Sequence, residues 1–213
     1  MNPIETWHAE TLCKATCDAL KKNGFNALYV ATGAEALSYI ESLAKSGETV
    51  GIGGSTTIRE LGTIERLEAK GAKVLDHSRE GISPEEKMDV MRAQLTSDLF
   101  LSSSNAITLK GEIFNIDGVG NRVAALTFGP KKTVVVAGYN KIVRNLDEAR
   151  ARCESLASPM NCRRLNVPTP CAKTGTCMDC SAERRICRIY SVLERRPSRS
   201  DFTVILVGER LGY

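Results

Sequence analysis

The chain has 213 residues, 42% of them hydrophobic and 25% charged, which suits one globular α/β domain with a full hydrophobic core. Its net charge of +4 is a mild excess, and only 5% of its residues are aromatic. These values argue against a nucleic-acid-binding protein, because such proteins need a strongly basic face or aromatic side chains that stack on bases.

Helix and strand patterns alternate along most of the sequence. Helices are predicted over residues 5–22, 33–45, 56–71, 83–98, 145–157 and 182–195. Buried strands are predicted over residues 25–31, 48–54, 72–77, 99–104, 133–140 and 202–208. The segment 107–114 has two short apolar runs around Lys110-Gly111, which indicates a β-hairpin. This order predicts an α/β fold, in which a mostly parallel sheet is flanked by helices and carries an inserted hairpin.

The domain organisation follows from the last quarter of the chain. Residues 158–195 are rich in Pro, Gly and Cys and predict an excursion from the α/β body. The β-branched run at 202–208 predicts a strand that returns to the main sheet. We therefore expect a single domain over residues 1–213, with a Cys-rich C-terminal excursion inserted before its last strand.

Localisation is predicted from what the sequence lacks. No apolar run approaches the ~20 residues of a membrane-spanning helix, and the amphipathic N-terminal segment does not resemble a secretory signal. We expect a cytoplasmic protein without a membrane span, and a homodimer is compatible with the sequence. In that compartment, closely spaced cysteines are more often metal ligands or redox groups than structural disulfides.

Half of the eight cysteines lie in one short segment, spaced C-x5-C-x2-C-x6-C. Four thiolates suit either tetrahedral Zn²⁺ or a [4Fe–4S] cluster, and both use Cys-x2-Cys pairs. Free thiols or a single disulfide are the alternative, although the surrounding loop has few apolar residues that could bury four cysteines. The predicted metal ligands are Cys171, Cys177, Cys180 and Cys187.

The first candidate ligand site lies where the strand 48–54 ends and the helix 56–71 begins. Gly53 and Gly54 would let the backbone approach a ligand, while Ser55, Thr56 and Thr57 supply hydroxyl groups. Free N–H groups at a helix N-terminus favour an anion, and open α/β sheets bind ligands at the carboxyl ends of their strands. A tight turn with a Ser or Thr N-cap is the simpler alternative.

Two further segments carry polar groups that could meet a ligand. Glu112 and Asp117 could act as an acid and a base, although an ordinary hairpin with exposed carboxylates explains their spacing equally well. Asn140 and Lys141 follow the strand 133–140, where a parallel sheet would present them to an anion.

Several sequence strings resemble the LUD-domain family, which includes the C subunit of bacterial lactate-utilisation systems and was formerly grouped as a domain of unknown function. They are GGSTTIRELG, SSNAIT, GEIFNIDGVGNRVAALTFGPK, NKIV and the cysteine segment ending in RIC, and the resemblance spans about residues 5–212. It implies a fold like those of ribose-5-phosphate isomerase, glucosamine-6-phosphate deaminase and CoA transferases. It also implies an association with the oxidation of L-lactate to pyruvate, alongside partner proteins rich in iron–sulfur clusters.

The resemblance and the residue patterns together define the candidate site. The lactate-utilisation C subunit generally lacks the cysteine tail, so the chain resembles a different branch of that family. The kinship with redox proteins favours [4Fe–4S] over zinc. The candidate catalytic residues are Glu60, Glu112, Asp117 and Lys141. The candidate ligand-binding residues are Gly53, Gly54, Ser55, Thr56, Thr57, Ser104, Asn105, Asn115, Asp117, Gly118, Gly120, Asn121, Arg122, Asn140 and Lys141.

Two functions remain open from the sequence. The first is a redox enzyme or accessory subunit that binds a small anionic metabolite; an isomerase-like or CoA-transferase-like enzyme would use the same pocket. The second is a non-catalytic module for ligand sensing or assembly, in which the metal is purely structural.

Overall fold

The main sheet consists of six parallel strands in the order β1-β10-β7-β4-β2-β3. The computed structural model describes residues 1–213. The predicted α/β class and the mostly parallel sheet are confirmed. The six strands are β1 (Asn26–Val30), β2 (Thr49–Ile52), β3 (Lys73–Asp76), β4 (Leu99–Ser102), β7 (Lys132–Gly138) and β10 (Asp201–Val207).

The last strand lies inside this sheet rather than at its edge. β10 pairs in parallel with β1 on one side and with β7 on the other, as the β-branched run at 202–208 predicts. Phe202 and Val204–Val207 are fully buried, because both faces of a parallel sheet are covered. The chain thus returns to its body after the cysteine segment.

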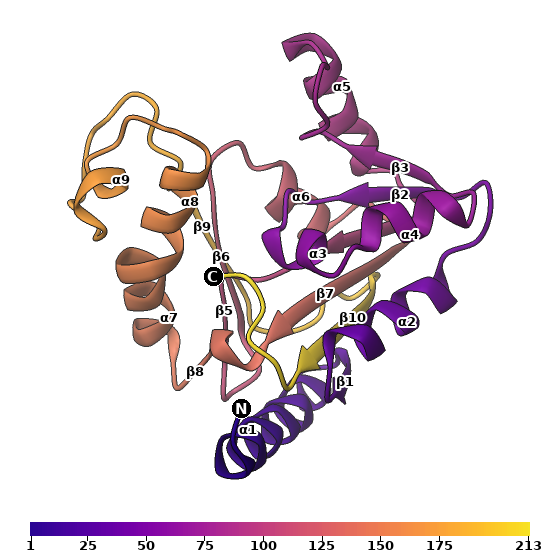
Figure 1. The fold of residues 1–213 in the computed structure, drawn as a ribbon, viewed down its shortest axis with the longest axis vertical. Coiled ribbons are helices and arrows are strands. Elements are labelled where there is room, and N and C mark those ends of the chain that lie inside the picture. The colour runs from indigo at the N-terminus through magenta and orange to yellow at the C-terminus, as the bar shows by residue number, and fades with distance from the viewer.

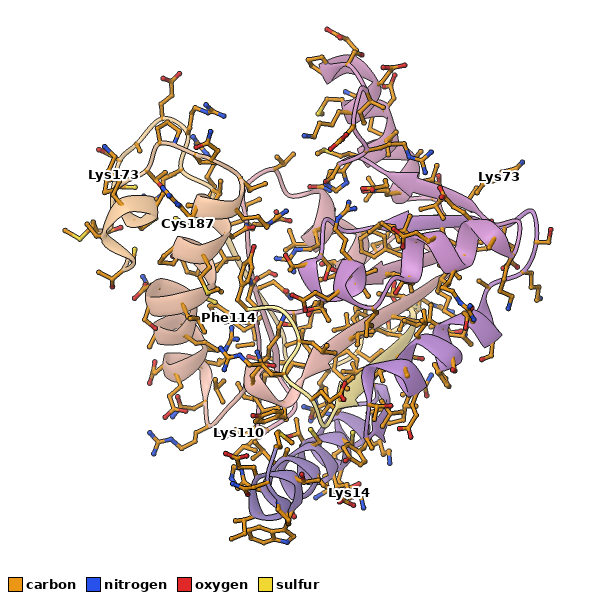
Figure 2. All side chains as sticks on the ribbon, viewed as in Figure 1. Lys14, Lys73, Lys110, Phe114, Lys173 and Cys187 are labelled. Atoms are coloured by element: carbon orange, nitrogen blue, oxygen red, sulfur yellow. The ribbon has the colours of Figure 1, made fainter.

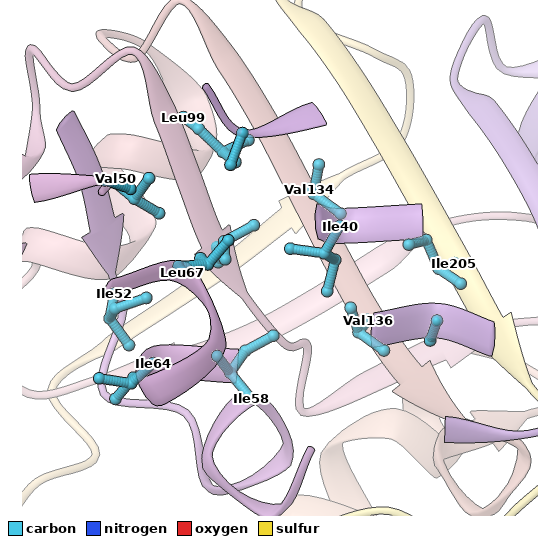
Figure 3. Packing of buried hydrophobic residues seen from close by; sticks show 14 of the residues in the cluster. Ile40, Val50, Ile52, Ile58, Ile64, Leu67, Leu99, Val134, Val136 and Ile205 are labelled. Carbon is cyan, nitrogen blue, oxygen red and sulfur yellow. The ribbon is translucent and has the colours of Figure 1, made fainter. Parts of the chain in front are cut away.

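Helices cover both faces of the main sheet (Figure 1). They are α1 (Pro3–Lys22), α2 (Gly33–Leu43), α3 (Thr56–Glu60), α4 (Thr63–Ala69), α5 (Pro84–Gln94) and α6 (Asn121–Thr127). One hydrophobic core packs α2, α3 and α4 against the sheet, and Figure 3 shows Ile40, Ile58 and Leu67 facing Val134 and Val136 there. A second core lies on the opposite face and includes Cys13, Cys17 and Leu20 of α1.

A second sheet of four short strands stands beside the main one, in the order β8-β5-β6-β9. Its strands are β5 (Ala106–Thr108), β6 (Ile113–Asp117), β8 (Ile142–Val143) and β9 (Ile189–Leu193). β5 and β6 are antiparallel around Lys110-Gly111, so the predicted hairpin is confirmed. A short 3₁₀ turn, η1 (Tyr139–Lys141), connects β7 to β8.

Two helix predictions are wrong. The predicted helix at 182–195 is instead a loop followed by β9, which pairs with β6. The short strand is flanked by arginines, which suggested a charged helix, and its residues alternate between half-buried and exposed, as in a strand with one face toward solvent. The predicted helix at 56–71 is two short helices, because Gly62 takes a left-handed conformation between α3 and α4.

The predicted helix at 145–157 is longer than expected. α7 (Leu146–Arg152) continues through a π-helical turn, η2 (Cys153–Ala157), into α8 (Ser158–Arg164). Pro159 is tolerated because it lies in the first turn of α8. The Cys-rich segment therefore starts within a helix, continues through α9 (Cys171–Thr174) and ends in β9.

None of the helices is both long and apolar enough to span a bilayer.

Gly111 provides a test of how the hairpin docks on α1. Its φ is +78°, and a Cβ atom there would lie 2.7 Å from the backbone of Ala19 and Leu20. Gly47 has a similar φ of +82° but open space around it. We predict that Gly47→Ala costs about 1 kcal/mol of unfolding free energy and Gly111→Ala at least ~2 kcal/mol more, measured by urea denaturation. Equal costs for the two variants would contradict this packing.

Candidate functional site

A cavity of about 320 Å³ lies at the carboxyl ends of β2, β4 and β7. The loop 53–56 and the loop 102–105 form its floor, and residues 116–122 form one wall. Residues 157–165, at the junction of η2 and α8, form the wall on the side of the cysteine segment. This is the edge of a parallel sheet at which ligands bind in open α/β folds.

The turn after β2 brings backbone close to the cavity. Gly54 has a φ of +67°, and a Cβ there would approach His77 Nε2 to 3.2 Å, so only glycine fits without strain. Ser55 caps α3 by accepting a hydrogen bond from the Ile58 N–H at 3.3 Å. α3 has only five residues, so its dipole is weaker than that of the long helix expected from the sequence.

Lys141 is the most buried charged side chain in the cavity wall, with 3% of its surface exposed. Its Nζ donates hydrogen bonds to Thr57 Oγ1 at 3.0 Å and to Ser103 Oγ at 2.9 Å. Burial, followed by repulsion from Arg152 and Arg122, lowers the pKa of Lys141 from 10.5 to about 7. Near neutral pH this amine is therefore poised between its charged and neutral forms.

Arg122 holds the polar wall of the cavity together. Its Nη1 donates to the Ser103 carbonyl and to Asn115 Oδ1, and its Nη2 donates to Asn105 Oδ1 and the Ile116 carbonyl. All four acceptors are neutral. The guanidinium thus joins the loop after β4 to β6 while its positive charge stays beside the cavity.

Arg152 adds a third positive charge from α7. Its Nε donates to the Asn140 carbonyl at 3.2 Å and its Nη1 to the Asn105 carbonyl at 2.6 Å, while its buried Nη2 has no acceptor. Neither Lys141, Arg122 nor Arg152 takes part in any of the ion pairs of the chain. Glu60 and Asp117 attract them only at longer range.

His77 lines the opposite side of the cavity at the end of β3. Gln94 Nε2 donates to the carbonyls of Ile52 and Leu75, both at 2.9 Å. Gln94 Nε2 lies 3.0 Å and Gln94 Oε1 3.3 Å from His77 Nδ1. Because both Nε2 hydrogens already point at carbonyl oxygens, Oε1 is the group left to accept a hydrogen bond from the ring. This arrangement assigns the proton to Nδ1 and leaves Nε2 as an acceptor. Burial lowers the pKa of His77, which keeps the ring neutral.

Most candidate ligand-binding residues gather at the cavity, and the others lie just behind it. Thr57 holds Lys141, Asn115 holds Arg122, and Asn140 binds the backbone of Leu211 and Gly212. Gly120 does not line the cavity and is the left-handed N-cap residue of α6. The candidates that line the cavity are Gly53, Gly54, Ser55, Thr56, Ser104, Asn105, Asp117, Gly118, Asn121, Arg122 and Lys141.

The four candidate catalytic residues are in different places. Glu60 is exposed and accepts a hydrogen bond from the Gly212 N–H at 2.7 Å, while Glu112 accepts from Thr108 Oγ1 in the hairpin; neither lines the cavity. Asp117 lines the cavity and accepts from the Gly118 and Val123 N–H groups. Lys141 is the candidate whose buried amine faces this space.

The sequence motifs did not indicate several of the residues at the site. His77 follows β3, so its place at the end of a parallel strand is the one clue that the sequence offers. Arg152, behind the cavity, is the last residue of α7, and Asn161 and Tyr213 come to the cavity from α8 and the C-terminus, which only the tertiary fold reveals.

The four predicted metal ligands lie on the side of the molecule that carries α8 and α9, where Figure 2 labels Cys187 and Lys173. All eight cysteines are free. Cys171 is buried with its Sγ 3.3 Å from Thr169 Oγ1, and Cys177, Cys180 and Cys187 are half-buried. No three His, Cys, Asp or Glu side chains lie close enough together to share a metal ion. Metal ligation by these thiols stays a prediction.

The cysteine segment is nonetheless part of the cavity wall. Ile186, which precedes Cys187, lines the cavity, and a Cβ at Gly118 would lie 3.0 Å from the Ile186 carbonyl oxygen. Cys162 is on α8, whose Asn161 and Leu165 also line the cavity. Movement of the cysteine segment would therefore reshape the cavity.

Comparisons with known proteins agree with this architecture. The sequence matches the LUD domain family over residues 13–207. The chain belongs to the LUD domain family. No curated protein sequence matches it significantly. Among solved structures it is similar to a DUF162 family protein from Deinococcus radiodurans, DUF162 being the older name of LUD. That likeness has a TM-score of 0.53 and 15% identity over 93% of this chain and 98% of the other, and it shows the shared fold.

The lowered pKa of Lys141 makes the stability of this LUD domain depend on pH. Between about pH 7 and 10 the unfolded lysine binds a proton that the folded one lacks, so stability rises with pH. Lys141→Met removes this dependence. We predict that its unfolding free energy relative to the wild type falls by up to about 1.4 kcal/mol per pH unit across that window.

Urea denaturation at several pH values measures this difference. The exposed Lys73→Met, which changes the charge equally at the far end of β3, serves as the control and should differ from the wild type by a constant amount. A constant difference for Lys141→Met as well would show that the folded Lys141 stays protonated.

Proposed function

We propose that this lactate-utilisation-type domain binds a small anionic metabolite, a carboxylate or a phosphate, in the cavity at the carboxyl ends of β2, β4 and β7. The observation that supports it is the cluster of Lys141, Arg122 and Arg152 beside one cavity without a carboxylate in ion-pair contact. Desolvated charges are costly when unpaired, and a bound anion would supply the missing counter-charge.

The remaining groups suit a ligand that also carries hydroxyl or carbonyl groups. The side chains of Asn121 and Tyr213 line the cavity as hydrogen-bonding partners. His77 Nε2 offers an acceptor for a ligand hydroxyl. A cavity of about 320 Å³ is at the small end of ligand pockets, which favours a small metabolite over a nucleotide cofactor.

We further propose that the chain works as a redox enzyme or accessory subunit, and that Cys171, Cys177, Cys180 and Cys187 hold a [4Fe–4S] cluster or Zn²⁺. The spacing of the thiols supports ligation, and Arg185, which binds the Cys180 and Cys187 carbonyls, would offset the thiolate charge. Iron–sulfur partner proteins would be the electron carriers. The alternative is a ligand-sensing module whose metal only braces the cavity wall, because Ile186 lines the cavity and precedes Cys187.

Anion binding is tested by isothermal titration calorimetry with L-lactate, inorganic phosphate and a sugar phosphate. We expect at least one of these to bind. Lys141→Met should weaken that binding at least about tenfold at pH 6.5, where the wild-type amine is mostly charged. Lys87→Met, at the rim of the cavity, should weaken it only a few-fold because its charge is solvated.

Lys73→Met is the control for a simple change in net charge and should bind as the wild type does. Binding that is unaffected by Lys141→Met, or the failure of every carboxylate and phosphate to bind, would overturn the proposal.

The metal proposal is tested by visible absorption and metal analysis of anaerobically purified protein. A brown protein with iron and sulfide indicates a cluster that can carry electrons, and a colourless protein with one zinc indicates a structural site. Cys177→Ser should lose the metal. Cys17→Ser, which changes a buried cysteine on α1 far from the cysteine segment in sequence, should keep it. A wild-type protein with neither metal would contradict ligation.

A further inference from the structure

The Lys141 amine is held in a fixed position inside the cavity wall. Its two hydrogen-bond acceptors, Thr57 Oγ1 and Ser103 Oγ, are neutral hydroxyl groups. The Ser103 hydroxyl in turn donates to the Ser104 carbonyl at 3.3 Å, so it is oriented to accept from the amine. A lysine used only for structure would be expected to pair with a carboxylate, and this one has none in contact.

Charged and titratable groups face Lys141 from four elements. Arg122 of α6 and Arg152 of α7 disfavour its protonated form, whereas Glu60 of α3 and the Cys153 thiol of η2 act in the opposite sense. Burial adds to the repulsion by the arginines, and together they lower the pKa of the amine. A desolvated lysine beside other cations is the arrangement that makes an amine nucleophilic at neutral pH.

We propose that the Lys141 amine condenses reversibly with the carbonyl group of a small anion, a 2-oxo acid or a phosphorylated ketose, that enters this cavity. The inference rests on the proposed anion site and names the class of its ligand. The positive charge of Arg122 and Arg152 attracts the anionic group of the ligand, and the neutral amine takes the carbonyl carbon.

The condensation needs no oxidant or reductant. The lone pair of Lys141 Nζ attacks the carbonyl carbon and forms a carbinolamine. Both amine protons then leave with the carbonyl oxygen as water, and a carbon–nitrogen double bond remains. Thr57 and Ser103, whose hydroxyls touch Nζ, can pass these protons. Hydrolysis reverses every step.

Reductive trapping tests this step without knowledge of the physiological reaction. The protein is incubated at pH 7 with sodium cyanoborohydride and either pyruvate or dihydroxyacetone phosphate, and its intact mass is measured. We expect one adduct, heavier than the protein by the mass of the ligand less one oxygen atom. Peptide mapping should place it on Lys141 and not on exposed Lys14 or Lys73, and L-lactate, which has no carbonyl, should give none.

Two variants sharpen the test. Lys141→Arg keeps the charge but has no condensing amine, so it should give no adduct; Lys87→Met keeps the amine and should still be labelled. If pyruvate alone labels Lys141, the ligand is a 2-oxo acid, and if dihydroxyacetone phosphate alone labels it, a phosphorylated ketose. Unselective labelling of surface lysines, or no adduct, would overturn the inference. If anions still bind in calorimetry in that case, the proposed function survives without the covalent step.

Discussion

The site depends on one electrostatic constraint, the burial of Lys141 beside two guanidinium groups at the end of the central strand β7. Removing an ammonium group from water is costly, and the fold places no carboxylate against it. The amine therefore either gives up its proton or takes an anion. Both outcomes favour the binding of small anions in the cavity. The second sheet contributes to this arrangement because its strand β6 carries two of the four acceptors of Arg122.

The cysteine segment forms part of the wall of the cavity. The helix formed by α7, η2 and α8 carries Arg152 behind the cavity and Asn161 along its wall, and a π-helical turn lies between them. Such turns interrupt the regular helical ladder and occur often at functional sites. Ile186 then links the cavity to Cys187. A metal held by the thiols would therefore fix the wall opposite the glycine-rich turn.

Sequence patterns predicted the elements whose signal is local. The return of β10 to the main sheet and the hairpin at Lys110-Gly111 follow from a β-branched run and from turn residues. They also indicated Lys141, since it follows a buried strand. They missed β9, because this five-residue strand is flanked by charged residues that resemble an exposed helix. Arg152 and Tyr213 reach the site through long-range packing alone, which no local pattern encodes.

The protonation state of Lys141 tests the central claim most directly. Heteronuclear NMR of protein with isotope-labelled lysine can follow its Cε resonance during a pH titration, with Lys141→Arg to assign the signal. The buried cationic cluster predicts a midpoint of about 7, well below those of the exposed lysines. A midpoint near 10.5, the ordinary value for lysine, would show that the amine is solvated or paired and would contradict this account of the site.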